Sequence, residues 1–220
     1  MTDNKKILMV VTNICEFKNG EPTGVWFEEF AVPYNEFKKQ GWKVTVATLT
    51  GEIAPIDPAS ENLFEDIIWN EAKKALNDTE KLDTIDYTKY DAVVLPGGHG
   101  PMFDLAESET VGHIINHMNK EGKLIAAICH GPAGLLSAKH EGIPFVNGRK
   151  LTCFTNEEEA IAKKDKLVPF LLQDALIYDG ALFSEDKPGA VNIIVDGNLI
   201  TAQNYQSAKD FAKAITDYLD

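Results

Sequence analysis

Lys123-Leu-Ile-Ala-Ala-Ile-Cys129-His130-Gly131-Pro132-Ala133-Gly134 is the segment from which most of the fold can be predicted. A short apolar run ends at a cysteine and passes at once into small residues, which predicts a buried strand, a sharp turn and a helix over residues 132–140. Ala127 and Gly131, two residues before and after the cysteine, are small, as such a turn requires. The helix N-terminus is expected to favour the thiolate form of Cys129. The alternative interpretation is a buried, unreactive cysteine at a strand end.

Strand-like and helix-like segments alternate along the chain, which predicts an α/β fold with a mostly parallel central sheet covered on both faces. Strands are expected at residues 6–12, 43–49, 92–96, 123–128, 151–155, 192–195 and 199–202, the last two joined by a hairpin turn at 196–198. Helices are expected at residues 25–40, 62–77, 110–121, 132–140, 157–163, 167–177 and 207–219. Pro33 should kink or split the first helix.

The chain of 220 residues suits a single α/β domain over residues 1–220. Residues 60–90 are long for a connection between strands, so this segment could form a small lid or a dimer element. The 34 acidic and 21 basic residues give a net charge of −13, which argues against nucleic acid or an anionic membrane as a partner. The early apolar run at residues 7–11 is too short to span a membrane or to form a signal-peptide core.

The cysteine and histidine positions exclude several other classes of site. Three widely spaced cysteines without a CxxC pair indicate a reducing cytoplasm with at least one free thiol. His113 and His117 are four residues apart on a predicted helix, but the glutamate of a zincin motif and a third ligand are missing. No GxGxxG signature follows the first strand. The sequence therefore predicts no metal and no cofactor.

Several motifs resemble those of the DJ-1/ThiJ/PfpI superfamily. They are Ala126-Ala-Ile-Cys129-His130-Gly-Pro-Ala133, Leu95-Pro-Gly-Gly-His-Gly-Pro-Met-Phe-Asp104, Thr23-Gly-Val-Trp-Phe-Glu-Glu29, Phe154-Thr-Asn-Glu-Glu-Glu159 and Ile200-Thr-Ala-Gln-Asn-Tyr-Gln-Ser-Ala208. They follow the family order over nearly the whole chain. Within the superfamily the chain is most similar to the Hsp31-like branch, and there to the compact fungal-type proteins. The resemblance implies a flavodoxin-like three-layer sandwich with a nucleophile elbow, and a homodimer.

The resemblance also implies roles for individual residues. Cys129 corresponds to the family's nucleophile and His130 to the adjacent histidine that carries protons. Glu29 corresponds to a carboxyl group beside the cysteine, and repulsion between two negative charges would keep a proton on it. Glu159 corresponds to the acid that orients the histidine, although it follows two other glutamates and could instead complete a helix capping box.

The turn Gly97-Gly98-His99-Gly100 is predicted to lie at the same edge of the sheet as the cysteine. By the same resemblance, the backbone N–H groups of Gly98 and His130 would form an oxyanion site, with Gly97 beside them. His99 could line the pocket or make a purely structural hydrogen bond.

The resemblance implies a glyoxalase III-like lyase (a D-lactate dehydratase) that needs neither glutathione nor a cofactor. Cys129 would add to methylglyoxal or a similar 2-oxoaldehyde, and the hemithioacetal would rearrange and yield D-lactate. Deglycation of proteins is a related activity. Two alternatives stay open. One is an Hsp31-type stress chaperone that holds unfolded or glycated proteins without using Cys129. The other is a PfpI-type cysteine peptidase or amidase, which relies on higher oligomers.

Overall fold

The computed structural model of the chain describes residues 4–61 and 69–220. At its centre lies a seven-stranded sheet with the order β10-β11-β5-β4-β1-β2-β3. All neighbouring pairs in this sheet are parallel except β10 and β11, which form the predicted antiparallel hairpin. The seven strands are β1 (Lys6–Val10), β2 (Lys43–Thr48), β3 (Glu80–Lys81), β4 (Ala92–Leu95), β5 (Leu124–Ile128), β10 (Ile193–Asp196) and β11 (Leu199–Ala202).

The order of the five central strands confirms the predicted fold class. Read from β2 through β1, β4 and β5 to β11, the parallel strands follow the 2-1-3-4-5 order of flavodoxin-like folds. In this order the chain reverses direction across the sheet beside β1, and ligands of such folds bind outside the carboxyl ends of the strands near that point. The loops that follow β1, β4 and β5 therefore meet at one edge.

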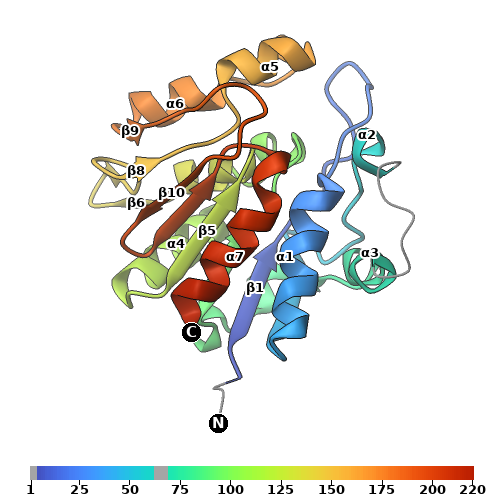
Figure 1. Cartoon of the computed structure of the whole chain (residues 1–220), viewed down its shortest axis with the longest axis vertical. Coiled ribbons are helices and arrows are strands. Elements are labelled where there is room, and N and C mark those ends of the chain that lie inside the picture. Colours follow the sequence, from blue (N-terminus) through green and yellow to red (C-terminus); the bar gives the residue numbers. More distant parts are fainter. Residues whose placement is uncertain (1–3, 62–68) are drawn as a thin grey trace.

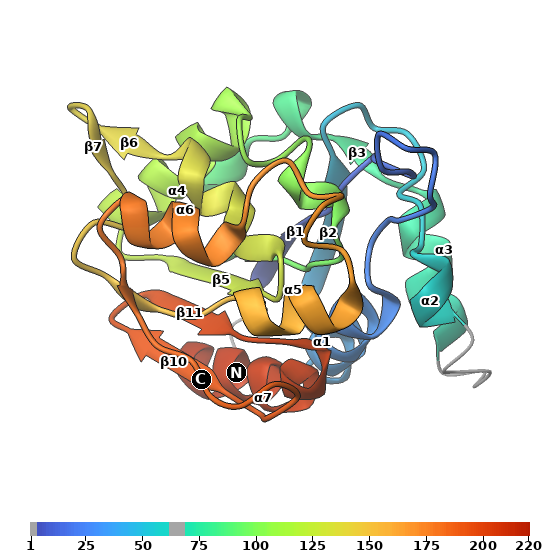
Figure 2. The same ribbon diagram turned by 90° about the horizontal axis from the view of Figure 1, so that it is seen from above.

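Helices cover both faces of the sheet (Figures 1 and 2). On one face α1 (Phe27–Lys39) and α7 (Ala208–Leu219) lie side by side. On the other face lie α4 (Glu109–Lys120), α6 (Leu172–Tyr178) and the 3₁₀ helix η5 (Gly131–Ser137). The shorter elements are α2 (Pro58–Glu61), α3 (Asn70–Asn77), α5 (Asn156–Ala162), β6 (Lys139–His140), β7 (Ile143–Pro144), β8 (Lys150–Leu151), β9 (Leu182–Phe183), and the 3₁₀ helices η2 (Leu82–Thr84), η3 (Tyr87–Lys89), η4 (Gly100–Met102) and η6 (Tyr205–Ser207).

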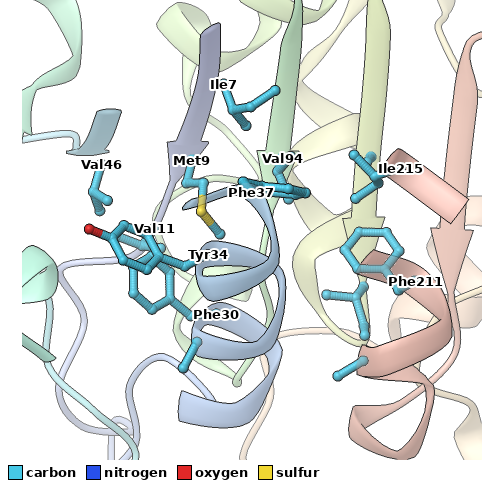
Figure 3. Packing of buried hydrophobic residues seen from close by; sticks show 14 of the residues in the cluster. Ile7, Met9, Val11, Phe30, Tyr34, Phe37, Val46, Val94, Phe211 and Ile215 are labelled. Carbon is cyan, nitrogen blue, oxygen red and sulfur yellow. The ribbon is translucent and has the colours of Figure 1, made fainter. Parts of the chain in front are cut away.

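Alternation along the strands supplies a hydrophobic core on each face of the sheet, because successive side chains of a strand point to opposite sides. Ile7 and Met9 of β1 belong to the core beneath α1 and α7, whereas Leu8 and Val10 belong to the core beneath α4. Figure 3 shows the first of these cores. Its large helical side chains include Phe30, Tyr34 and Phe37 of α1 and Phe211 and Ile215 of α7.

The first helix runs from Phe27 to Lys39 as one element, so Pro33 does not split it. The kink that the sequence offers as the alternative stays a prediction. Pro33 has no N–H to donate to the carbonyl of Glu29, but its ring is buried against the protein interior. Burial of the ring offsets the lost intrahelical bond, and the helix continues.

The segment after the elbow differs from its prediction. In place of an α-helix over residues 132–140 it forms the 3₁₀ helix η5, followed by the hairpin β6–β7. Glycine and proline are poor helix formers, and Ser137 Oγ donates to the carbonyl of Gly134 at 2.6 Å. Ala138 then bonds to the carbonyl of Leu135, three residues back. The short, tight helix follows from these local preferences.

Two further predicted elements are shorter than expected. The helix α6 begins at Leu172 rather than at residue 167, because Pro169 disfavours helical geometry in the residue before it. The predicted strand at 151–155 is reduced to β8, since Thr155 leaves the extended path to become the N-cap of α5. The other predicted strands and helices match within a few residues where the structure describes them.

The segment at residues 60–90 contains α3, the edge strand β3 and two 3₁₀ turns, and β3 pairs with β2. Residues 62–68, the first part of the helix predicted at 62–77, lie outside the described residues. The lid or dimer element therefore stays a prediction, as does the single domain over 1–220. Within residues 4–61 and 69–220, no helix is both long and apolar enough to cross a membrane.

Candidate active site

Cys129 lies on a strained turn at the carboxyl end of β5. Its φ of 58° falls in the left-handed region, which costs a residue with a side chain about 1–2 kcal/mol. Two backbone bonds hold it there. Its N–H donates to the carbonyl of Ala202 at 2.9 Å, and its own carbonyl accepts the N–H of Phe154 at 2.9 Å. The neighbouring strand and the loop before α5 thus impose the elbow geometry that the sequence predicts.

Glycines allow the loops after β4 and β5 to approach each other closely. A Cβ on Gly131 would stand 1.9 Å from the carbonyl oxygen of Leu95. Gly98 has a φ of +89°, and a Cβ there would stand 2.1 Å from the carbonyl oxygen of Gly24. Close backbone approach, not phosphate binding, explains these glycines.

The side chains of His130, Glu159 and His99 form a buried chain of hydrogen bonds beside the cysteine. His130 Nδ1 lies 3.3 Å from Cys129 Sγ, and His130 Nε2 lies 2.7 Å from Glu159 Oε2. The other carboxylate oxygen, Glu159 Oε1, lies 2.8 Å from His99 Nε2. One carboxylate therefore accepts from two imidazole rings, whose centroids are 4.1 Å apart.

The charge of Glu159 decides where the protons of the two rings lie. Burial opposes its ionisation, but His130 and His99 outweigh that effect and hold its pKa well below the usual range. An ionised carboxylate only accepts hydrogen bonds, so both imidazoles carry their proton on Nε2 when neutral. His130 Nδ1 then presents a lone pair to the thiol of Cys129. This assignment follows from the hydrogen-bond network.

Of the three consecutive glutamates, Glu159 is the one that contacts His130 and Glu158 is the one in the capping box. The carboxylate of Glu158 accepts the N–H of Thr155 at 3.1 Å, while Thr155 Oγ1 accepts the N–H of Glu158 at 3.1 Å. Glu157 has no such role at this helix start. The helix turn of about 100° per residue thus separates the capping acid from the acid that faces the histidine.

Glu29 reaches the site from the first turn of α1 and contacts Cys129. Its side chain is fully buried, and its Oε2 accepts the N–H of Gly97 at 3.0 Å. Its other oxygen, Oε1, has no partner of good hydrogen-bond geometry within the described residues. Burial raises the pKa of Glu29 to about 8. The carboxyl group is therefore protonated at neutral pH, but the cause is burial and not the predicted repulsion by a thiolate.

The expected resting thiolate of Cys129 is not supported. Burial raises the pKa of the Cys129 thiol well above its usual value, and the adjacent Glu29 carboxyl raises it further. The N–H of Gly98 acts in the opposite direction but does not outweigh them. The 3₁₀ helix η5 is too short for its N-terminus to reverse this balance. Cys129 must lose its proton to a neighbour as it reacts, and His130 Nδ1 lies within reach.

A cavity of about 400 Å³ is lined in part by Cys129. Gly98 and His99 are also among the residues that line it. The indole of Trp26 stacks on the ring of Tyr205, with centroids 5.1 Å apart, and both rings line the cavity. Lys164, paired with Glu21 and placed over the ring of Phe17, lies at another part of the wall. The cavity can hold a small organic molecule against the sulfur.

The motifs and this geometry agree with a match to a known protein family. The model of the DJ-1/PfpI family matches residues 23–218 of the chain. The chain belongs to the DJ-1/PfpI family.

Relatives of this DJ-1/PfpI protein confirm the Hsp31-like branch. The glutathione-independent glyoxalase hsp3102 of Schizosaccharomyces pombe is 30% identical over 92% of both chains. The crystal structure of glyoxalase III from Candida albicans is 26% identical, covers 98% of each chain and superposes with a TM-score of 0.85. Rapid Encystment Protein 24 kDa from Francisella tularensis is 32% identical over 98% of this chain and 99% of its own, with a TM-score of 0.93.

The predicted site residues of this DJ-1/PfpI protein lie together, and several of their neighbours were missed from the sequence. Cys129, His130, Glu29 and Glu159 converge as expected, with Gly97 and Gly98 beside them. His99 both lines the cavity and bonds to Glu159. Trp26, Tyr205, Phe154 and Lys164 were not assigned to the site. The first three lie within motifs that carry the family resemblance, which is the signal that could have found them.

The ligand atoms of His99, His130 and Glu159 lie within 4.8 Å of one another, as a metal site requires. In the structure, however, both Nε2 atoms are already hydrogen-bonded to the carboxylate. A metal at these atoms would have to displace both Nε2 protons. This cluster is also distinct from the pair His113 and His117, for which the described residues provide no third ligand.

We expect the free energy of unfolding to fall with rising pH because of Glu29. Its pKa is raised from 4.5 to about 8 in the folded protein, so the folded state holds this proton more tightly than the unfolded state. The contribution of Glu29 to the free energy of unfolding, at most about 5 kcal/mol, is fully present below about pH 4.5 and is lost as pH rises through 8. In Glu29→Gln this dependence disappears.

Urea unfolding of both proteins at pH 5, 6.5 and 8.5 checks this dependence. The contributions of all other titrating groups to the free energy of unfolding cancel in the difference between variant and wild type. The stability of Glu29→Gln relative to wild type should increase with pH. A difference that stays constant over this range would show that Glu29 is not protonated in the folded protein.

Proposed function

We propose that this protein is a glutathione-independent glyoxalase that converts 2-oxoaldehydes such as methylglyoxal to 2-hydroxy acids. The observation that carries the proposal is the thiol of Cys129 at the floor of an open cavity, between the base His130 and the protonated acid Glu29. The full-length similarity to proteins named glyoxalases supports it. The chemistry needs a nucleophile, a group that moves a proton and an oxyanion site, and it needs no hydride carrier.

The first step is addition of the sulfur to the aldehyde carbon. His130 Nδ1 removes the thiol proton as the S–C bond forms, and the aldehyde oxygen becomes an oxyanion. The N–H groups of Gly98 and His130 donate to no protein oxygen or nitrogen within the described residues. Gly98 donates to the sulfur in the resting protein, and as the S–C bond forms both N–H groups would donate to the oxyanion. The proton on His130 then passes to the oxyanion, giving a neutral hemithioacetal.

The second step moves a proton from the former aldehyde carbon to the adjacent carbonyl carbon. His130 takes the C–H proton and an enediolate forms, in which a proton moves from one oxygen to the other. Glu29 protonates the adjacent carbon, because its carboxyl group holds a proton at neutral pH, and the proton on His130 then returns to Glu29. The product is a thioester of Cys129 with a 2-hydroxy acid, and water hydrolyses it. With methylglyoxal the acid is lactate. We assign the D enantiomer and a D-lactate dehydratase type of lyase on the family resemblance.

Incubation of the purified protein with methylglyoxal in the absence of glutathione tests the proposal. Substrate loss is followed by absorbance, and the product is measured with dehydrogenases specific for D- and L-lactate. We expect stoichiometric D-lactate. Substrate loss without lactate would point to simple thiol trapping, and no loss from folded protein would refute the activity.

The same assay tests independence from metals. The protein dialysed against a chelator should retain its full rate, because hydrogen bonds already complete the His130–Glu159–His99 cluster. Excess Zn²⁺ should inhibit, since binding to these atoms removes the base from Cys129. Loss of activity on chelation that Zn²⁺ restores would contradict the proposed mechanism.

We extend the proposal to the cell and to larger substrates. The three cysteines are free thiols, in keeping with a reducing cytoplasm. A hemithioacetal on a cysteine and the early adducts of glycated proteins have related chemistry, so deglycation would use the same groups. A homodimer is expected from the family resemblance, and the residues named above all come from one chain.

A further inference from the structure

One polar atom at the cavity, Nδ1 of His99, takes no part in the formation of the hemithioacetal or the thioester. His99 Nδ1 has no hydrogen-bond partner within the described residues, and it is not among the buried unpartnered atoms. It is therefore accessible from the cavity that the ring of His99 lines. Because His99 Nε2 donates to Glu159, Nδ1 carries a lone pair.

The ring of His99 is held in one orientation. Its side chain is only 9% exposed and makes an aromatic contact with Phe17, whose ring centroid is 5.3 Å away. On another side it lies against His130 at 4.1 Å and is fastened to Glu159 by the bond at Nε2. A group held in this way presents its free nitrogen at a defined place, which is what proton transfer in a reaction requires.

The second half of the proposed reaction needs a base that the first half does not supply. His130 Nδ1 faces the sulfur at 3.3 Å, and this sulfur is bonded to the acyl group in the thioester. Water that attacks the acyl carbon must lose a proton on the side open to the cavity. His99 and Cys129 both line that cavity.

We propose that His99 is the general base for hydrolysis of the Cys129 thioester. This proposal rests on the proposed glyoxalase function. His99 Nδ1 takes a proton from water as the water oxygen bonds to the acyl carbon. The C–S bond then breaks, its electron pair stays on the sulfur, and the 2-hydroxy acid leaves. The proton on His99 returns to the sulfur through cavity water, so that the thiol and both imidazoles are restored.

The electrostatic surroundings of His99 agree with this role. Burial lowers its pKa, and the neighbouring His130 lowers it further, while Glu159 and Asp57 act in the opposite direction. The net effect leaves the ring neutral at physiological pH. The two imidazoles joined by Glu159 are thus assigned to different half-reactions: His130 to formation of the bond to sulfur, and His99 to its hydrolysis.

The variant His99→Gln tests this assignment, because its amide can still donate to Glu159 but cannot act as a base. His113→Gln, on the exposed face of α4, is the matched control. Each protein is mixed with methylglyoxal, quenched at intervals and weighed intact by mass spectrometry. Hydroxylamine distinguishes the thioester, which it releases as a hydroxamate, from a hemithioacetal.

In His99→Gln we expect the thioester to form within about 3-fold of the wild-type rate, to accumulate to nearly one per chain, and to be hydrolysed at least about 10²-fold more slowly. Added imidazole should speed its release in His99→Gly. Slow formation without accumulation would overturn the proposal and make His99 a positioning residue, and so would unchanged lactate release. Absence of lactate from the wild type would instead refute the glyoxalase function itself.

Discussion

Cys129→Ala is expected to lower lactate formation from methylglyoxal by about 10⁴-fold or more, because every covalent step depends on this sulfur. The change removes one buried atom, the sulfur, with its contact to the N–H of Gly98, and it keeps the two backbone bonds to Ala202 and Phe154 that hold the elbow. The fold should therefore persist. Initial rates of lactate formation by the variant and by the wild type check the loss of activity. Thermal unfolding curves of the two proteins check that the fold persists.

Cys153→Ala is the matched control for the loss of activity. Cys153 is also fully buried, and burial also raises its thiol pKa, but it has no imidazole partner, and its sulfur donates to the carbonyl of Phe154. We expect it to keep most of the activity. Full turnover by Cys129→Ala would refute the nucleophile, and would shift the proposed function to binding of unfolded proteins, which needs no thiol.

Gly131→Ala is expected to destabilise the protein by about 3 kcal/mol or more, which lowers the melting temperature by roughly 6–12 °C for a chain of this length. The added Cβ would stand 1.9 Å from the carbonyl oxygen of Leu95. The carbonyl oxygen belongs to the backbone of β4, and the new Cβ is attached to the backbone of the elbow. Neither is part of a flexible side chain that could move aside. The collision also displaces His130, and activity should fall with stability.

Gly134→Ala, three residues further along η5, provides the comparison for this substitution. There the nearest atom to a new Cβ is Cδ1 of Leu95 at 3.0 Å, the end of a flexible side chain. We expect a change of less than about 1 kcal/mol, since alanine also favours helical geometry. Equal effects of the two substitutions in urea unfolding would show that close packing at Gly131 is not what the elbow requires.

Much of the architecture could be predicted because its determinants are local. The apolar runs in β1, β4 and β5, with turn residues at both ends, predict buried parallel strands, and the structure has them. The hairpin β10–β11 follows from its turn residues. The errors arise where two local preferences compete, as at Pro169 and in the glycine-rich η5.

The contacts within the site could be predicted less completely from the sequence. The register of three consecutive glutamates depends on where α5 begins, and that is decided by the cap at Thr155. The contact between Glu29 and the elbow joins segments separated by about a hundred residues. The cavity wall of Trp26 and Tyr205 likewise forms only when α1 and the loop after β11 are brought together.

The α/β class, the elbow at Cys129 and the kinds of residue beside it follow from the amino-acid sequence, because strand patterns and tight turns depend on neighbours along the chain. The protonation of the site depends instead on how the chain folds. Burial raises the pKa of both Glu29 and Cys129, and two imidazoles share the carboxylate of Glu159. These effects come from desolvation and from charges brought within a few ångströms by folding, and neither is encoded in local spacing.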